Sequence, residues 1–163
     1  MRFEEFTAAR LPMLLRYAML LSGDREQARD LVQEVLARAL VKWGRIGALD
    51  EPYAYVRRMV TNEFLSWRRR RRFRTVPLDE AVLSGREPVV PDHPDSDDLR
   101  DLLDRLPARQ RAVLVLRYYE DLGYDEIAAV LGCRVGTARG YASRGLAALR
   151  VELKTATNEE AHR

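Results

Sequence analysis

Apolar residues recur every three or four positions between residues 28 and 43, a spacing that places them on one face of an α-helix. Asp24 precedes this stripe and Gln27 follows Asp24 by three positions, which is typical of a capped helix N-terminus. We therefore predict an amphipathic helix that begins after Asp24. Its apolar stripe consists of Ala28, Leu31, Val32, Val35, Leu36, Ala39, Leu40 and Trp43.

Two further helical patterns flank this one. Residues 3–21 have the same spacing, but Pro12 lies among them, so we expect the helix to restart or kink there. Downstream, Pro52 suits the first turn of a helix whose stripe runs directly into the sequence RRRRRFR, residues 68–74. Together the patterns predict a first domain of three helices over residues 1–74. The stripe of the third helix consists of Tyr53, Val56, Val60, Phe64 and Trp67.

Residues 75–98 interrupt these patterns. The stretch has four prolines, seven acidic residues and no sustained period, which is typical of a solvated linker. Helical spacing returns over residues 99–153 and leaves a short tail, residues 154–163. Because strand-like alternation is missing from the sequence, we predict an all-α protein: two small helical domains joined by a flexible acidic linker.

The sequence of residues 124–150 has the pattern of a helix-turn-helix. Gly123 precedes a short helix, and Gly132 can adopt the left-handed conformation that ends it after Leu131. In the second helix, one face is apolar and consists of Val135, Ala138, Ala142, Leu146 and Leu149. The candidate DNA-binding residues lie away from this apolar face and are called the recognition face below. They are Arg134, Thr137, Arg139, Tyr141 and Arg144.

Charge favours DNA as the target of this second helix. Residues 134–150 hold four arginines and no acidic residue. Arginine on the first turns of such a helix can bridge O6 and N7 of guanine in the major groove. The alternative is a helical hairpin with a solvated outer face, which we favour less because the first helix is short. Gly136 and Gly140 each cost about 1 kcal/mol of helix propensity unless DNA or the first helix approaches them closely.

The charge of the whole chain is uneven. Its 163 residues are 47% apolar and carry a net charge of +3. Residues 1–74 hold 16 Arg and Lys against 9 Asp and Glu, residues 75–103 hold 2 against 8, and residues 104–163 hold 10 against 8. Two basic blocks around an acidic one indicate a polyanionic partner such as nucleic acid.

Several classes of protein are not expected. The sequence lacks a stretch of about 18 apolar residues and a secretory leader, so we expect a cytoplasmic protein without membrane insertion. A single cysteine, Cys133, excludes an internal disulfide, and two histidines are too few for the usual structural zinc site. We expect neither a metal site nor another cofactor. The sequence also lacks a catalytic triad, a phosphate-binding glycine loop and a paired acid and base, so we do not predict an enzyme.

A second basic surface is predicted at the end of the first domain. Six arginines lie among residues 68–74, and Arg57, Arg58, Thr61 and Asn62 lie one or two turns upstream. Six like charges repel one another without a polyanion, so we favour phosphate contacts over a solvated helix end. The aromatic residues of this helix fit core packing better than base stacking. The candidate DNA-binding residues, called the arginine surface below, are Arg58, Asn62, Arg68, Arg69 and Arg70.

A third surface, called the mixed face below, lies beside the stripe of the second helix. It carries both signs of charge, unlike the two basic surfaces. A face of this kind is either solvated or a protein-docking surface, and the local pattern does not decide between them. Its residues are Asp30, Gln33, Glu34 and Arg38.

In combination, these features resemble the extracytoplasmic-function sigma factors of bacterial RNA polymerase. The resemblance covers nearly the whole chain and implies a sigma region 2 domain at residues 1–74 and a region 4 domain at residues 99–153. It implies a protein that binds core polymerase and directs promoter-specific initiation of transcription. The stretches that carry it are GDREQARDLVQEVLARAL, EPYAYVRRMVTNEFLSWRRRRR, LPARQRAVLVLRYYEDL and EIAAVLGCRVGTARGYASRGLAALR, with the acidic linker between the second and third.

The resemblance also implies a role for each surface. The mixed face would contact the clamp helices of the polymerase β′ subunit. The loop of residues 44–51 and the arginine surface would open and read the −10 promoter element, and the recognition face would read the −35 element. Residues 109–119 would bind the β flap and support the helix-turn-helix. An anti-sigma factor is a further candidate partner.

The linker sets a limit on how the two domains act together. A chain of about 24 residues reaches about 80 Å when extended and about 27 Å as a random coil, whereas DNA boxes two helical turns apart are separated by about 70 Å. We therefore expect polymerase to hold the domains apart. A second hypothesis is that the acidic linker lies against the basic domains of the free protein and suppresses stray DNA binding.

Two other functions compete with this interpretation. A serine recombinase also uses a carboxy-terminal helix-turn-helix, but it needs an α/β catalytic domain for which the sequence has no strand pattern. A stand-alone helix-turn-helix regulator would bind a symmetric operator without polymerase. Cys133 fits a small packed residue better than a redox switch.

Overall fold

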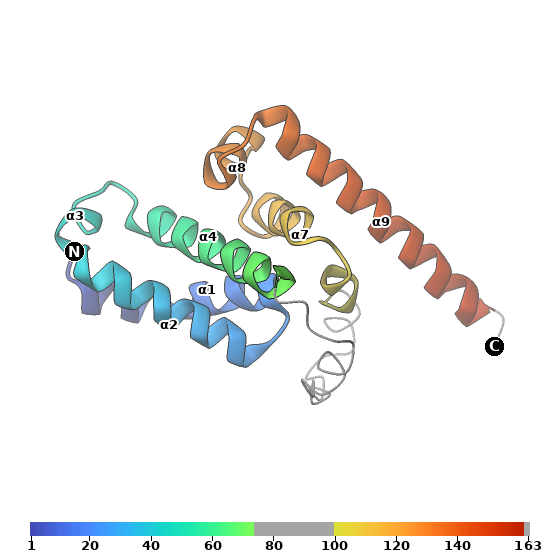
Figure 1. Cartoon of the computed structure of the whole chain (residues 1–163). Helices are drawn as coiled ribbons and strands as arrows, with labels where there is room; N and C mark the ends of the chain where they lie inside the picture. The colour runs from blue at the N-terminus through green and yellow to red at the C-terminus, as the bar shows by residue number, and fades with distance from the viewer. Residues whose placement is uncertain (74–99, 162–163) are drawn as a thin grey trace.

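The computed structural model describes residues 1–73 and 100–161. The regular structure in these two ranges is helical, which confirms the predicted all-α class. Figure 1 shows the N-terminal helices in blue to green beside the C-terminal helices in yellow to red. The predicted linker, and with it the hypothesis that its acids mask the basic domains, lies outside the described residues.

The N-terminal domain is a bundle of three long helices, α1 (Phe3–Ser22), α2 (Arg25–Val41) and α4 (Pro52–Phe73), with the short α3 (Trp43–Ile46) between α2 and α4. The predicted stripes face the bundle interior, as the sequence spacing requires. Side chains that are at most 2% exposed include Phe6, Leu14, Leu21, Val32, Val35, Val56, Val60 and Phe64.

The start of α2 is fixed by its cap. An Asp24 carboxylate oxygen accepts the backbone N–H groups of Glu26 and Gln27, at 2.8 and 3.4 Å. Just before it, Gly23 has φ 73° and closes α1 in the left-handed conformation that glycine adopts without strain. The α1–α2 turn is therefore encoded in the sequence on both sides.

Two expectations for this domain were wrong. Helix α1 is a single element through Pro12, so the expected restart was wrong, because Leu14 and Tyr17 beyond the proline are anchored in the core. The expected kink at Pro12 stays a prediction. Leu40 is 53% exposed, because it lies at the edge of its stripe, whereas Ala39 and Trp43 on either side of it in the sequence pack against the core.

The C-terminal domain begins with a helical segment at residues 100–104 and continues with α7 (Ala108–Leu114), the π-helical turn η1 (Val115–Tyr119), α8 (Tyr124–Leu131) and α9 (Val135–Ala161). The wide turn of η1 is rare and often marks a functional position. Helix α9 continues past the end predicted for it near residue 153.

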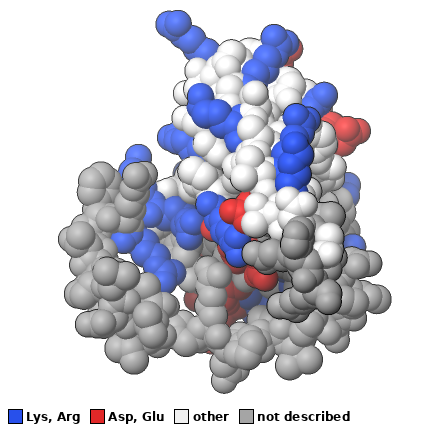
Figure 2. All heavy atoms as spheres, turned by 90° about the vertical axis from the view of Figure 1, so that its right-hand side faces the viewer, with Lys and Arg blue, Asp and Glu red and all other residues white. Residues whose placement is uncertain are grey.

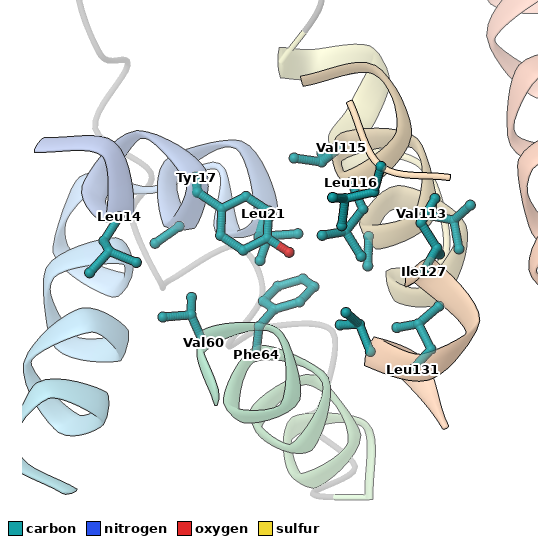
Figure 3. Close-up of a cluster of buried hydrophobic side chains, with 14 of the residues drawn as sticks. Leu14, Tyr17, Leu21, Val60, Phe64, Val113, Val115, Leu116, Ile127 and Leu131 are labelled. Carbon is teal, nitrogen blue, oxygen red and sulfur yellow. The ribbon is translucent and has the colours of Figure 1, made fainter. Parts of the chain in front are cut away.

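The two domains are not separate modules but share one apolar core. Helices α7 and η1 contact α1, and α7 and α8 contact α4. Figure 3 shows Tyr17, Leu21 and Phe64 of the N-terminal domain facing Leu116 and Ile127 of the C-terminal domain. The core of each domain is therefore closed partly by the other.

Candidate nucleic-acid interface

The turn between α8 and α9 has the predicted helix-turn-helix geometry. Gly132 ends α8 with φ 64°, and Ala138 and Ala142 bury the inner side of α9. Further along, α9 passes so close to α7 that a β-carbon on Gly145 would lie 2.9 Å from Cδ1 of Leu114. The packing of α9 on α7 therefore favours glycine at position 145. The sequence analysis missed Gly145, although it considered the two earlier glycines of this helix.

The recognition face lies largely in solvent. Arg134, Thr137, Arg139 and Arg144 are exposed, whereas Tyr141 is half-buried against the core. Figure 2 shows Lys and Arg side chains projecting at several places from the upper part of that view, where acidic side chains are few. The structure therefore keeps four of the five predicted residues available to a ligand.

Tyrosine rings orient two of these arginines. The guanidinium carbon of Arg139 lies 5.8 Å from the ring centre of Tyr124, and Arg144 lies 5.3 Å from that of Tyr141. Arg117 lies over Tyr124 as well, at 4.8 Å. Cation–π contacts of this kind limit the side-chain conformations without neutralising the charge. The arginines remain able to bind phosphate or guanine.

The two glycines flagged in the sequence have no close protein neighbour on the first helix. A β-carbon on Gly136 would meet nothing within 4 Å, and one on Gly140 would meet only Arg144, at 3.6 Å. Of the two reasons considered for these glycines, close approach of the first helix is excluded for the described residues. Close approach of DNA at Gly136 stays a prediction.

The arginine surface divides between two sides of α4. Arg58, Asn62 and Arg69 are exposed and spaced by four and seven residues, so they share one face. Arg68 is half-buried with its guanidinium 6.0 Å from the ring of Phe64, and Arg70 contacts Glu63 at 3.3 Å. These two flank the exposed face.

Two neighbours of this surface point inward instead. Thr61 is fully buried; it donates to the carbonyl of Arg57 at 2.9 Å, and the Tyr17 hydroxyl lies 2.6 Å from its oxygen. Burial raises the pKa of Tyr17 well above the usual range of a phenol, so the hydroxyl stays neutral. Thr61 and Arg57 are therefore not available to DNA, because the helical period turns them to the core side of α4.

The predicted loop of residues 44–51 begins inside α3 (Trp43–Ile46), and only residues 47–51 connect this helix to α4. Leu49 is 46% exposed, and Val41 at the end of α2 is 85% exposed. The loop is anchored by Trp43, whose indole N–H donates to the carbonyl of Met1 at 2.8 Å. A β-carbon on Gly47 would lie 2.8 Å from that indole nitrogen, so glycine is required there.

The mixed face is exposed on α2 and linked to α4. Arg38 contacts Glu34 at 3.0 Å and Glu63 of α4 at 3.0 Å. Hydrogen bonding to Glu34, followed by the charge of Glu63, raises the pKa of Arg38 above its ordinary value. Glu63 also contacts Arg70, so one carboxylate joins the mixed face to the arginine surface. Sequence analysis missed Glu63, because it lies 25 residues from Arg38 and carries no local pattern.

Residues 109–119 serve mainly as a support. The side chains of residues 111–116 are buried, including that of Arg111, which is 1% exposed. Only Arg109, Tyr118 and Tyr119 are exposed in this stretch. A buried arginine needs partners, and those of Arg111 lie partly in the other domain.

Comparison with known families identifies the chain. The family model "Sigma-70 region 2" matches residues 7–74 and the model "Sigma-70, region 4" matches residues 96–149. The chain belongs to the sigma-70 family of RNA polymerase sigma factors. It is 37% identical to the RNA polymerase sigma-E factor of Streptomyces coelicolor, over 94% of this chain and 86% of that protein. It is 33% identical to the ECF RNA polymerase sigma factor EcfG of Rhodopseudomonas palustris, over 83% and 76%.

Solved structures agree with this assignment. One similar structure is the sigma factor RpoE of Bartonella quintana, which was solved in complex with the anti-sigma factor NepR. This chain superimposes on it with a TM-score of 0.71 at 27% identity, and the match covers 93% of this chain and 96% of that one. The sigma-factor resemblance and the two-domain helical class are confirmed, and the stand-alone regulator is not favoured. Within the described ranges, the helices are too short or too polar to cross a bilayer.

Proposed function

We propose that this sigma factor binds core RNA polymerase through the mixed face, reads the −10 element with the loop of residues 44–51 and the arginine surface, and reads the −35 element with the recognition face. The observation that carries the proposal is the recognition face itself. Four of its side chains are exposed and polar or cationic, and they lie in a region without an acidic residue. Arg134 directly precedes α9, and Thr137, Arg139 and Arg144 lie on its first three turns.

At the −35 element, α9 enters the major groove with its N-terminal turns. Arg139, held by Tyr124, is placed to bridge guanine, while Thr137 and Arg134 contact phosphate or base edges. Gly136, with open space beside it, lets the DNA backbone approach the helix. Affinity from phosphate contacts makes this binding sensitive to salt.

At the −10 element, the two features of the N-terminal domain have complementary tasks. Arg58 and Arg69 supply phosphate contacts along one face of α4, and Asn62 between them offers an amide to a base. The exposed Leu49 and Val41 offer apolar contact to an unpaired base. The Arg38–Glu63–Arg70 network ties this surface to the polymerase-binding face.

The remaining assignments follow from the family. We place the protein in the cytoplasm with the polymerase and assign it no catalytic step, since nucleotide addition belongs to the polymerase. RpoE of Bartonella quintana was solved with an anti-sigma factor, and we propose a partner of that kind for this chain too.

Run-off transcription tests the proposal. The purified chain, added to bacterial core polymerase that lacks its own specificity subunit, should bind it and direct initiation at promoters recovered by sequencing the DNA bound to the holoenzyme. A footprint on a symmetric site by the chain alone, without any run-off transcript, would show a regulator instead.

A further inference from the structure

The ring of Tyr124, the first residue of α8, joins three helical elements of the C-terminal domain. The guanidinium carbon of Arg117, from η1, lies 4.8 Å from the ring centre, and that of Arg139, from α9, lies 5.8 Å from it. Over residues 1–73 and 100–161, neither arginine forms an ion pair with a carboxylate. The electron-rich ring is therefore the contact that the two cations share.

Arg117 is the fixed member of this pair. Its side chain is half-buried, and its Nη1 donates to the carbonyl of Leu122 at 2.9 Å. The N–H of Leu122 donates in turn to the carbonyl of Leu116 at 3.0 Å, which closes the backbone between η1 and α8. Because Leu122 lies two residues before Tyr124, Arg117 is held at the start of α8, where its guanidinium fixes the position of the ring.

Arg139 is the exposed member of the pair and belongs to the recognition face. An arginine side chain loses conformational freedom when it binds a base, and this loss reduces the affinity gained from the contact. The ring limits the conformations of Arg139 before DNA arrives, so less freedom is lost on binding. The charge of Arg117 also repels a second guanidinium, which keeps Arg139 from folding farther onto its own domain.

We propose that Arg117 and Tyr124 are positioning residues for −35 recognition: Arg117 fixes the Tyr124 ring, and the ring holds Arg139 in the conformation that bridges O6 and N7 of one guanine. This inference rests on the proposed function, in which Arg139 contacts a base. It adds that base discrimination depends on two residues that act through Arg139. It also gives a function to the π-helical turn η1, since such turns are rare and often lie at functional positions.

Positioning of this kind affects one base contact rather than overall DNA affinity. Phosphate contacts contribute to binding of every DNA sequence, whereas a bridging arginine contributes only where guanine presents N7 and O6. Replacing a guanine by 7-deazaguanine removes the N7 acceptor and leaves the base pair intact. The dissociation constant for the modified DNA divided by that for the unmodified DNA, called the 7-deaza ratio below, therefore measures this contact alone.

The experiment measures the 7-deaza ratio of the holoenzyme, formed from the full chain and core polymerase, on promoters recovered with it. Each guanine of the −35 element is replaced in turn. Tyr124→Leu removes the aromatic ring and Tyr124→Phe keeps it, while Arg117→Met removes the charge and Arg117→Lys keeps it. Arg150→Met, at an exposed arginine of α9 outside the recognition face, is the matched control. Circular dichroism and thermal unfolding confirm that each variant is folded.

In the wild-type chain, one guanine should give a 7-deaza ratio of about ten, and Arg139→Ala should lower this ratio to about one. Tyr124→Leu and Arg117→Met should lower it to about three or less, because Arg139 must then become ordered when it binds. Tyr124→Phe and Arg150→Met should keep the wild-type ratio, and Arg117→Lys should recover most of it. Tyr124→Leu added to Arg139→Ala should change the ratio no further, since both residues act through one contact.

A purely structural role of Arg117 or Tyr124 would weaken binding to all DNA alike and leave the ratio unchanged. A wild-type ratio in Arg117→Met and Tyr124→Leu, together with a ratio of about one in Arg139→Ala, would therefore overturn the positioning while supporting the base contact in the proposed function. A wild-type ratio in Arg139→Ala, or ratios of about one at every guanine in the wild-type chain, would overturn the base contact of Arg139 and the positioning with it.

Discussion

The two helices that we propose to contact DNA, α4 and α9, hold their arginines in different ways. On α4, Arg57 is paired with Glu120 and Arg70 shares Glu63 with Arg38, so carboxylates position much of the charge. On α9, Arg139 and Arg144 lie over tyrosine rings, and the sequence has no acid from residue 134 to residue 150.

This difference indicates different tasks. An arginine held by a carboxylate is partly neutralised and coupled to whatever else that carboxylate touches, here the mixed face and the other domain. An arginine held by a tyrosine keeps its charge and is oriented locally. We propose that α9 reads DNA on its own, whereas the DNA contact of α4 is coupled through Glu63 to the mixed face of α2 and through Arg57 to the C-terminal domain.

The largest expected effect comes from removing two exposed arginines at the start of α9. Arg134→Ala combined with Arg139→Ala should lower transcription from a promoter with a −35 element about 30-fold or more, since each specific contact is worth about 1–3 kcal/mol. Run-off transcription measures the loss. Arg150→Ala, an exposed arginine farther along α9, is the control and should retain activity. Equal losses in both would mean that only overall charge matters.

The next largest effect is expected from a glycine substitution in α9 that leaves every arginine in place. Gly145→Ala puts a methyl group 2.9 Å from Leu114 and should destabilise the protein by about 1–3 kcal/mol, because α9 must move away from α7. Thermal unfolding measures the loss of stability.

Gly136→Ala is expected to separate stability from DNA binding. The added methyl group meets no protein atom within 4 Å, so the substitution should be neutral or stabilising, yet weaken DNA binding. Normal promoter binding by Gly136→Ala would contradict close approach of DNA at that position.

Neutralising the shared carboxylate of the N-terminal domain should have a smaller effect. Glu63→Gln releases Arg38 and Arg70, and exposed ion pairs contribute about 1 kcal/mol or less, so core-polymerase affinity should fall less than about fivefold. Glu51→Gln, an exposed glutamate of the same domain, is the matched variant. Titration of labelled core polymerase gives both constants. An equal change in the two variants would remove the special role of Glu63.

The smallest effect is expected at the turn beside α9. Cys133 is half-buried and packs against the core, so Cys133→Ser should transcribe normally. Transcription with and without oxidant checks this. An oxidant sensitivity that disappears in Cys133→Ser would identify a redox switch after all.

Local patterns predicted the helices and the recognition face. The stripes around Val35, Val60 and Ala138 place these residues in the core, because helical period alone decides which side a residue faces. Pro12 misled the prediction, since tertiary anchoring outweighs one lost hydrogen bond.

The sequence could not predict the contact between the domains. Arg57 and Glu120 are 63 residues apart, and Arg111 and Leu20 are 91 residues apart, so only the folded chain brings them together. Arg111 did carry a weak signal, because it directly precedes the apolar run AVLVL, residues 112–116. A charged residue in such a position is either turned toward solvent or paired with a partner in the core, and the sequence does not identify that partner.

The most direct test of the account is site-specific cross-linking in the complete promoter complex. A photoreactive group at Thr137 of α9 and another at Tyr55 of α4 report where each domain lies on the DNA. The account predicts cross-links centred on two sites about two helical turns apart, although α8 and α4 are in contact in the free chain. Cross-links from both positions within a single turn would contradict it.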